Sequence, residues 1–69
     1  MLITMPQGTV KWFNNQKGFG FIKPDNSNKD IFVHKNGLID QVKEGDKVTY
    51  EVEEGQKGPN AIEVQLNND

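Results

Sequence analysis

K-G-F-G-F-I, residues 17–22, sets two phenylalanines two positions apart and places a glycine before each. Side chains of an extended strand alternate between its two faces, so Phe19 and Phe21 would point to one side of a sheet. Gly20 and Ile22 would point to the other side. Whichever side is the interior decides how the rest of the chain folds around this strand.

A second stretch, D-I-F-V-H-K at residues 30–35, repeats this alternation. Phe32 and His34 would share one face of a strand, and Ile31 and Val33 would share the opposite face. Two neighbouring strands would then carry one aliphatic face and one face of flat rings.

Short runs of alternating, β-branched or aromatic residues predict strands, separated by turns rich in glycine, asparagine and proline. The expected strands are residues 8–14, 18–23, 30–34, 47–54 and 60–66. Residues 35–46 are expected to connect the third strand to the fourth with at most a short 3₁₀ turn. Because a flat sheet would leave one face uncovered, we expect an all-β fold in which five antiparallel strands close into a small barrel.

Aliphatic residues at alternating positions are sufficient to fill such a barrel. The expected interior consists of Val10, Ile22, Ile31, Val33, Val48, Tyr50, Val52, Ile62 and Val64, with Leu38, Ile39, Val42 and Leu66 at its ends. This set occupies the face opposite to Phe19, Phe21 and Phe32. We therefore expect these rings on the outside of the barrel.

The composition limits the possible function classes. The chain has 69 residues, no cysteine and a formal net charge of −2, which fits one domain without disulfides or thiolate metal sites. It contains neither an apolar run of membrane-spanning length nor the pattern of a signal peptide, so we expect a cytoplasmic protein with no membrane partner. The charge is uneven, because residues 1–35 contain five lysines and two acids, whereas residues 36–69 contain three lysines and eight acids.

An exposed patch of phenylalanines is unusual on a monomer and indicates a binding surface. Flat rings stack on nucleobases and lysines contact phosphates, so rings interleaved with lysines predict a platform for single-stranded nucleic acid. Gly18 and Gly20 would let a ligand approach the backbone closely. Duplex DNA is disfavoured, because the sequence predicts no helix for the major groove and contains no arginine. The alternative is a protein-interaction module whose aromatic face meets another protein or a second copy of the chain.

Neither catalysis nor a cofactor is expected. The sequence has one histidine, one serine and no cysteine, which is too few for a nucleophilic triad or a histidine metal cluster. Residues 17–22 lack the third glycine of a dinucleotide-binding loop and the Gly-Lys-Ser/Thr of a P-loop. The acidic pairs Glu53-Glu54 and Glu44/Asp46 are expected to be solvated charges in loops.

Together these stretches resemble the bacterial cold-shock proteins. The matching motifs are G-T-V-K-W-F-N (8–14), K-G-F-G-F-I (17–22), D-I-F-V-H (30–34), E-G-D-K-V (44–48) and K-G-P-N-A (57–61). The resemblance implies an OB-type barrel at residues 8–66, between a tail at 1–7 and a tail at 67–69. It also implies a monomer that binds single-stranded RNA and single-stranded DNA with low sequence specificity. Such a protein would act as an RNA chaperone and influence transcription and translation in a cold-shock-type stress response.

The resemblance also assigns roles to individual residues. Base stacking is assigned to Trp12, Phe19, Phe21, Phe32 and His34, polar contacts to Lys11, Asn14, Lys17, Asp30 and Lys57, and the shape of the last loop to Gly58 and Pro59. Strict alternation from Val10 would turn Trp12 inward and Phe13 outward. We follow the resemblance and expect a bulge or strand end that turns Trp12 toward the binding face.

Two departures from the family pattern concern the end of this platform. Lys35 stands where the family usually carries another aromatic residue, and residues 36–44 form a shorter segment than the family's, without its exposed phenylalanine. Each base stacked on an aromatic side chain contributes about 1–3 kcal/mol. We therefore expect weaker binding than in a relative with the complete set of rings.

Overall fold

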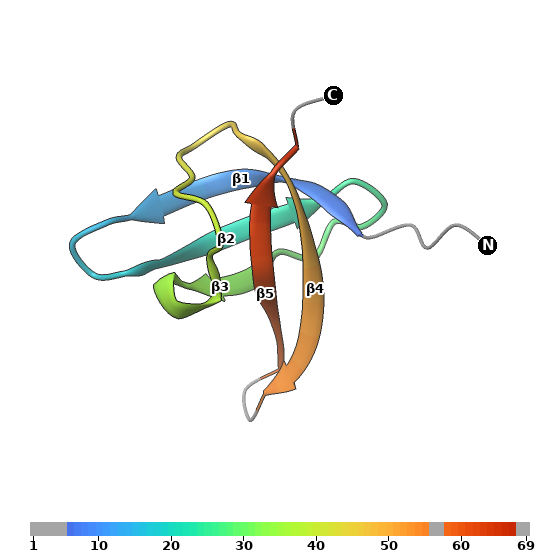
Figure 1. Ribbon diagram of the computed structural model, residues 1–69. Helices are drawn as coiled ribbons and strands as arrows, with labels where there is room; N and C mark the ends of the chain where they lie inside the picture. The colour runs from blue at the N-terminus through green and yellow to red at the C-terminus, as the bar shows by residue number, and fades with distance from the viewer. Residues whose placement is uncertain (1–5, 56–57, 68–69) are drawn as a thin grey trace.

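The computed structural model describes residues 6–55 and 58–67. Its elements are β1 (Gln7–Asn14), β2 (Phe19–Pro24), β3 (Ile31–His34), the 3₁₀ turn η1 (Lys35–Gly37), β4 (Lys47–Gly55) and β5 (Gly58–Leu66). The strands form a closed barrel in the order β1-β2-β3-β5-β4, which confirms the expected all-β barrel (Figure 1). No helix in the described residues is long and apolar enough to cross a membrane.

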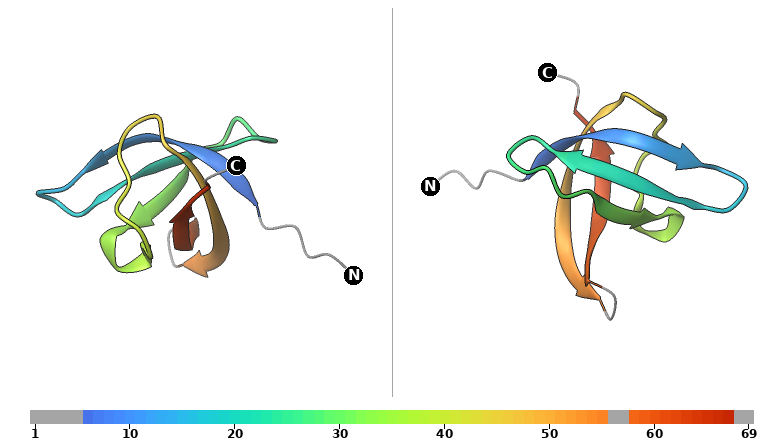
Figure 2. Two further views of the ribbon diagram at one scale, coloured as in Figure 1. Left: turned by 45° about the horizontal axis from the view of Figure 1, so that its top comes forward. Right: turned by 180° about the vertical axis from the view of Figure 1, so that it is seen from behind.

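One strand pairing differs from the expected pattern. β3 and β5 run parallel, with Phe32 opposite Asn60 and Val33 opposite Ala61, whereas the other pairings in the described barrel are antiparallel. The connection of residues 35–46 carries the chain across the barrel before β4 begins. The β4–β5 hairpin then returns β5 in the direction of β3, and it crosses the β1–β3 sheet when the molecule is viewed from behind (Figure 2).

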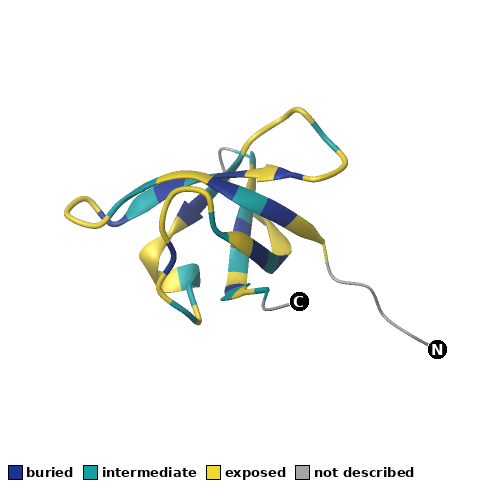
Figure 3. Ribbon diagram, turned by 90° about the horizontal axis from the view of Figure 1, so that it is seen from above, coloured by how far each residue is buried: buried dark blue, intermediate teal, exposed yellow. Residues whose placement is uncertain are grey.

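The core lies between these two layers of strands. Its buried side chains are Val10, Ile22, Val33, Val42, Val48, Tyr50, Ala61 and Val64, and Phe13, Ile31 and Leu38 pack against them. Buried positions alternate with exposed ones along the strands, and the loops are mostly exposed (Figure 3). The aliphatic face of the strands is therefore the interior, as the sequence pattern predicts.

A bulge in β1 decides the orientation of Trp12. Val10 pairs with Ile22 but Trp12 pairs with Phe21, so Lys11 is an extra residue on this strand. The extra residue reverses the alternation beyond it, which turns Trp12 outward and lets Phe13 pack against the core. The bulge expected from the family resemblance is confirmed.

A second bulge, in β5, was not anticipated from the sequence. Thr49 pairs with Gln65 but Glu51 pairs with Ile62, and Glu63 adopts a positive φ of 51° at this shift. Ala61 and Val64, three positions apart, both face the interior as a result. The expected burial of Ile62 is wrong in part, since its side chain is only half-buried.

Three further positions of the expected interior are exposed. The exposed fractions are 45% for Val52, 58% for Ile39 and 37% for Leu66. Val52 follows the same alternation as Val48, but it lies in the outer part of β4. The β4–β5 hairpin projects beyond the β1–β3 sheet (Figure 1). Ile39 lies in the connection between η1 and β4. Its backbone N–H donates to the Val64 carbonyl at 2.7 Å, while its side chain is exposed to solvent.

Candidate nucleic-acid interface

Four rings from three adjacent strands meet on the outer face of the barrel, and we call Trp12, Phe19, Phe21 and Phe32 the aromatic patch. The strand register sets Trp12 opposite Phe21 and Phe21 opposite Phe32. The ring centroid of Trp12 lies 5.4 Å from that of Phe21 and 5.7 Å from that of Phe19. The ring centroid of Phe32 lies 5.8 Å from those of both Phe19 and Phe21. The expected stacking residues other than His34 are thus in direct contact with one another.

The rings of the aromatic patch shield one another only in part. Trp12 is 38% exposed, and the three phenylalanines are half-buried. Edge-to-face and tilted contacts at these distances stabilise aromatic pairs by about 0.5–1.5 kcal/mol. The contacts therefore hold the patch together without a ligand and leave its rings partly exposed to solvent.

His34 extends the patch at the end of β3, where it pairs with Phe19 across the sheet. Its side chain is exposed, and Nδ1 accepts a hydrogen bond from the Asn36 backbone N–H at 3.2 Å, which caps η1. Because Nδ1 is the acceptor in this contact, Nε2 is the ring nitrogen left to donate to a ligand. The hydrogen bond with Asn36 holds the His34 ring beside the patch and leaves the Nε2 edge of the ring free of this contact.

Lys11 and Asp30, two of the expected polar contacts, form one ion pair. Lys11 Nζ lies 2.9 Å from Asp30 Oδ2, and the lysine side chain is 57% exposed. The pair joins the β1 bulge to the residue before β3. The pair thus lies beside strands that carry the patch, and the exposed lysine is accessible to a phosphate.

Asn14 and Lys17 belong to the turn between β1 and β2. The Asn14 side-chain oxygen accepts from the Lys17 N–H at 2.9 Å, and the Asn14 carbonyl accepts from the Gly18 N–H at 2.7 Å. Asn14 is thus engaged in shaping the turn, whereas the Lys17 side chain is exposed.

The sequence interpretation assigned the glycines of K-G-F-G-F-I to turn geometry and to the close approach of a ligand. Both are buried. Gly18 has a φ of +77° in the turn, and Gly20 lies opposite Phe13, where a Cβ would collide with Phe13 and the Trp12 carbonyl. The turn role is confirmed for Gly18, whereas Gly20 serves packing.

The last loop is described only in part. Lys57 lies outside the described residues, and Gly58 and Pro59 begin β5 at the far end of the hairpin. Pro59 directly precedes Asn60, which pairs with Phe32 of the aromatic patch.

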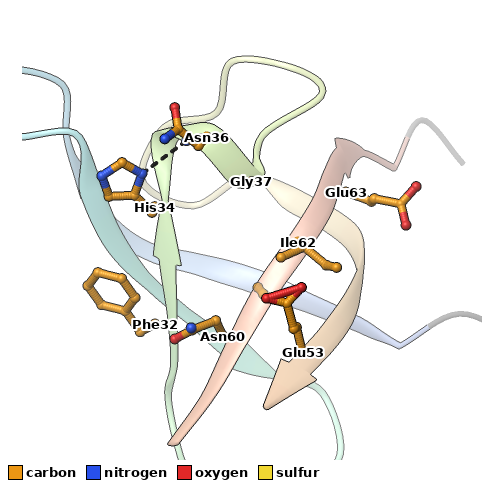
Figure 4. Close-up of a pocket in the computed structure, with 9 residues that line it drawn as sticks. Phe32, His34, Asn36, Gly37, Glu53, Asn60, Ile62 and Glu63 are labelled. Atoms are coloured by element: carbon orange, nitrogen blue, oxygen red, sulfur yellow. Dashed lines mark hydrogen bonds between the residues drawn. The ribbon is translucent and has the colours of Figure 1, made fainter. Parts of the chain in front are cut away.

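A groove of about 310 Å³ continues the surface beyond Phe32 and His34 (Figure 4). It is lined by Phe32, His34, Asn36, Gly37, Glu53, Asn60, Ala61, Ile62 and Glu63. Sequence analysis assigned Asn60, Ile62 and Glu53 no role in binding, although it placed Glu53 correctly within the fourth strand. The parallel pairing of β3 with β5 brings these residues beside Phe32, and no spacing in the sequence signals that pairing.

Carboxylates dominate the far side of this groove. The pKa of Glu63 is raised from its ordinary value of 4.5 by a hydrogen bond with the Glu51 side chain and by repulsion between the two acids. Within the described residues, no group of three potential metal ligands comes together. The surface thus changes from aromatic and basic on β1–β3 to acidic on β4–β5.

Comparisons with known proteins agree with this geometry. Residues 6–67 match the family model of the "'Cold-shock' DNA-binding domain". The "Cold shock protein" of Arthrobacter globiformis is 50% identical over 66 residues, which cover 90% of this chain and 98% of that protein. The "Major cold shock protein" of Streptococcus pyogenes serotype M1 is 48% identical over 64 residues, which cover 87% of this chain and 94% of that protein. The "Cold shock-like protein CspA" of Vibrio cholerae serotype O1 is 48% identical over 61 residues, with 83% and 87% covered.

The barrel is accordingly an OB-fold, and the family is one of nucleic-acid-binding proteins. A family model that spans almost the whole chain, together with relatives of this similarity, shows that the chain belongs to the family of cold-shock domains.

Proposed function

We propose that this protein binds single-stranded RNA and single-stranded DNA with low sequence specificity on its aromatic patch. The observation that carries the proposal is the contact among four partly exposed rings on three adjacent strands, with the exposed Lys11 at their edge. Every nucleobase has a flat face, so stacking on such rings tolerates any sequence. A duplex hides those faces, because its bases are stacked on one another, whereas unpaired bases leave them free.

In this proposal the side chains divide into stacking and polar groups. Trp12, Phe19, Phe21, Phe32 and His34 stack on bases, Lys11, Asn14, Lys17, Asp30 and Lys57 contact phosphates or base edges, and Gly58 and Pro59 shape the adjoining loop. The Lys11–Asp30 ion pair supports the polar roles, since it places a donor and an acceptor next to each other at the patch. The domain would comprise residues 8–66, with residues 1–7 and 67–69 as tails.

The cellular role would be that of a monomeric, cytoplasmic RNA chaperone. Binding that tolerates any sequence keeps transcripts from pairing with themselves, which would influence transcription and translation. The relatives' names as cold shock proteins support a role in a stress response. The proposed activity is binding without catalysis, because it requires only stacking and ionic contacts.

Tryptophan fluorescence in a salt series tests the proposal. Trp12 is the only tryptophan in the sequence and lies in the aromatic patch, so stacking of hexathymidine or hexauridine should quench it. The logarithm of the binding constant should fall linearly with the logarithm of the salt concentration, with a slope of about −0.7 for each phosphate contacted. Quenching by neither oligomer, combined with self-association in sedimentation, would favour the protein-interaction alternative.

A further inference from the structure

One row of paired residues crosses the whole barrel and links the aromatic patch to the groove. Trp12 pairs with Phe21, Phe21 with Phe32, Phe32 with Asn60, and Asn60 with Glu53. Paired residues share a face of the sheet, so the row presents three rings, then an amide, then a carboxylate. The groove lies at the change from rings to polar groups.

Glu53 supplies the charged group on the β4 wall of this groove. The described residues contain two salt bridges, Lys11–Asp30 and Lys47–Asp25, and Glu53 takes part in neither. Glu63, the other acid of the lining, points away from β3 and shares its hydrogen bond with Glu51, whereas the Glu53 side chain lies beside Ile62 (Figure 4). Glu53 therefore offers both carboxylate oxygens to whatever enters.

An ionised carboxylate only accepts hydrogen bonds, which restricts what can bind beside it. A phosphate is repelled, so the backbone of a strand stacked on Phe32 has to pass outside the groove while a base enters it. Among the bases, guanine presents two adjacent donors, N1–H and the 2-amino group, which match the two oxygens of a carboxylate. Thymine and uracil present one N–H between two carbonyl oxygens, and cytosine and adenine present one amino group beside a ring nitrogen.

We propose that this groove is a base pocket in which Glu53 selects guanine. The inference rests on the proposed function, since the base arrives as part of a strand bound to the aromatic patch. A volume of about 310 Å³ lies at the lower end of the range for small-molecule pockets and suits a single base. Phe32, His34 and Ile62 flank the base, and its donor edge faces Glu53. Binding to the patch remains tolerant of sequence, but one nucleotide position of the strand prefers guanine.

The test compares hexathymidine with a set of hexathymidines in which one thymidine is replaced by deoxyguanosine at successive positions. Dissociation constants come from quenching of Trp12. The oligomer with guanine at one particular position should bind at least about fivefold more tightly than hexathymidine. A gain of this size is typical of a well-made bidentate contact. Deoxyinosine, which lacks the 2-amino group, should lose most of this gain at the same position.

Glu53→Gln and Glu54→Gln form a matched pair of protein variants. Both remove one negative charge from the same strand, but only Glu53 lines the groove. Both changes should strengthen the binding of hexathymidine modestly, because less charge repels the phosphates. Only Glu53→Gln should abolish the preference for guanine over inosine. Since both side chains are exposed, both variants should keep the wild-type circular dichroism spectrum.

Several outcomes would overturn this inference while leaving the proposed function intact. One is hexathymidine binding without a preferred guanine position. Another is a guanine preference that survives in Glu53→Gln, or that disappears equally in Glu54→Gln. Saturable binding of an arginine-rich peptide that Glu53→Gln abolishes, without any guanine preference, would assign the groove to a basic peptide instead. If no oligomer binds at all, the proposed function itself fails.

Discussion

Gly20 is the residue on which the local packing of the aromatic sheet depends most directly. It lies on the inner face of β2, opposite Phe13, in a space that leaves no room for a methyl group. The ring of Phe13 fills the volume that a side chain at this position would occupy. Gly20 therefore determines how closely β1 and β2 approach on the inner side, and hence how the rings are set on the outer side.

Gly20→Ala should destabilise the protein by about 1–3 kcal/mol, the usual cost of overpacking a core. The nearest obstacle is backbone, the Trp12 carbonyl, which cannot move aside as a flexible side chain would. Urea unfolding followed by circular dichroism measures the change in the free energy of unfolding. A free energy equal to that of the wild type would contradict this packing role.

Glu63 should make stability depend on pH in a predictable direction. Its pKa is raised in the folded state by the Glu51 hydrogen bond and by repulsion, so the folded protein holds this proton more tightly than the unfolded chain. The associated stabilisation is present below the unfolded pKa and is lost as the pH rises through the folded pKa. Relative to Glu63→Gln, the wild type should lose stability as the pH rises from about 4 toward neutrality. A constant difference in the free energy of unfolding would rule this out.

At the scale of single elements, one half of the β4–β5 hairpin contributes to the core and the other half projects from the barrel. Val48 and Val52 lie on the same side of β4, yet Val48 is fully buried and Val52 is 45% exposed. Val48→Ala should therefore cost about 2 kcal/mol in the free energy of unfolding, whereas Val52→Ala should cost about 0.5 kcal/mol. Equal losses in urea unfolding would mean that the end of the hairpin is packed against the rest of the protein.

The end of β3 limits the aromatic surface. The Lys35 side-chain carbons lie against Gly18 in the β1–β2 turn, and its N–H donates to the Gly18 carbonyl at 2.8 Å. Lys35→Phe should add a ring next to His34 and strengthen hexathymidine binding about fivefold or more relative to Lys35→Gln. The glutamine variant controls for the lost charge. Equal affinity of the two variants would show that this position lies outside the nucleic-acid path.

Alternation predicts element faces only where a strand is regular. β2 and β3 contain no bulge, and the sequence alone orients Phe19, Phe21 and Phe32 correctly. β1 and β5 each contain an extra residue that exchanges the two faces partway along the strand. Trp12 could be oriented only through the family resemblance, and the burial of Ala61 could not be predicted at all.

At the scale of the whole molecule, the closed barrel separates two kinds of surface. β1–β3 carry the aromatic patch and exposed lysines such as Lys11 and Lys17, and β4–β5 carry Glu51, Glu53 and Glu63. The net charge of −2 conceals this separation. The uneven distribution of charge along the sequence predicts it, because the basic half of the chain forms three neighbouring strands.

The boundary between these surfaces could not be predicted from the sequence. It depends on the parallel pairing of β3 with β5, which sets Asn60 beside Phe32. The antiparallel β4–β5 hairpin then sets Glu53 beside Asn60. Phe32 is far from Glu53 and Asn60 in the sequence, and Glu53 and Asn60 each have the pattern of an ordinary strand position outside the core. The candidate patch was therefore predictable, whereas the groove next to it required the structure.

The central claim is that the aromatic patch binds single-stranded nucleic acid. The most direct test is the dissociation constant of hexathymidine for Phe32→Ala, with Ile39→Ala as the control, because Ile39 is an exposed apolar residue outside the patch. With both variants folded by circular dichroism, Phe32→Ala should weaken binding about five- to hundredfold and Ile39→Ala should leave it unchanged. A folded Phe32→Ala variant that binds hexathymidine as tightly as the wild type would contradict the account.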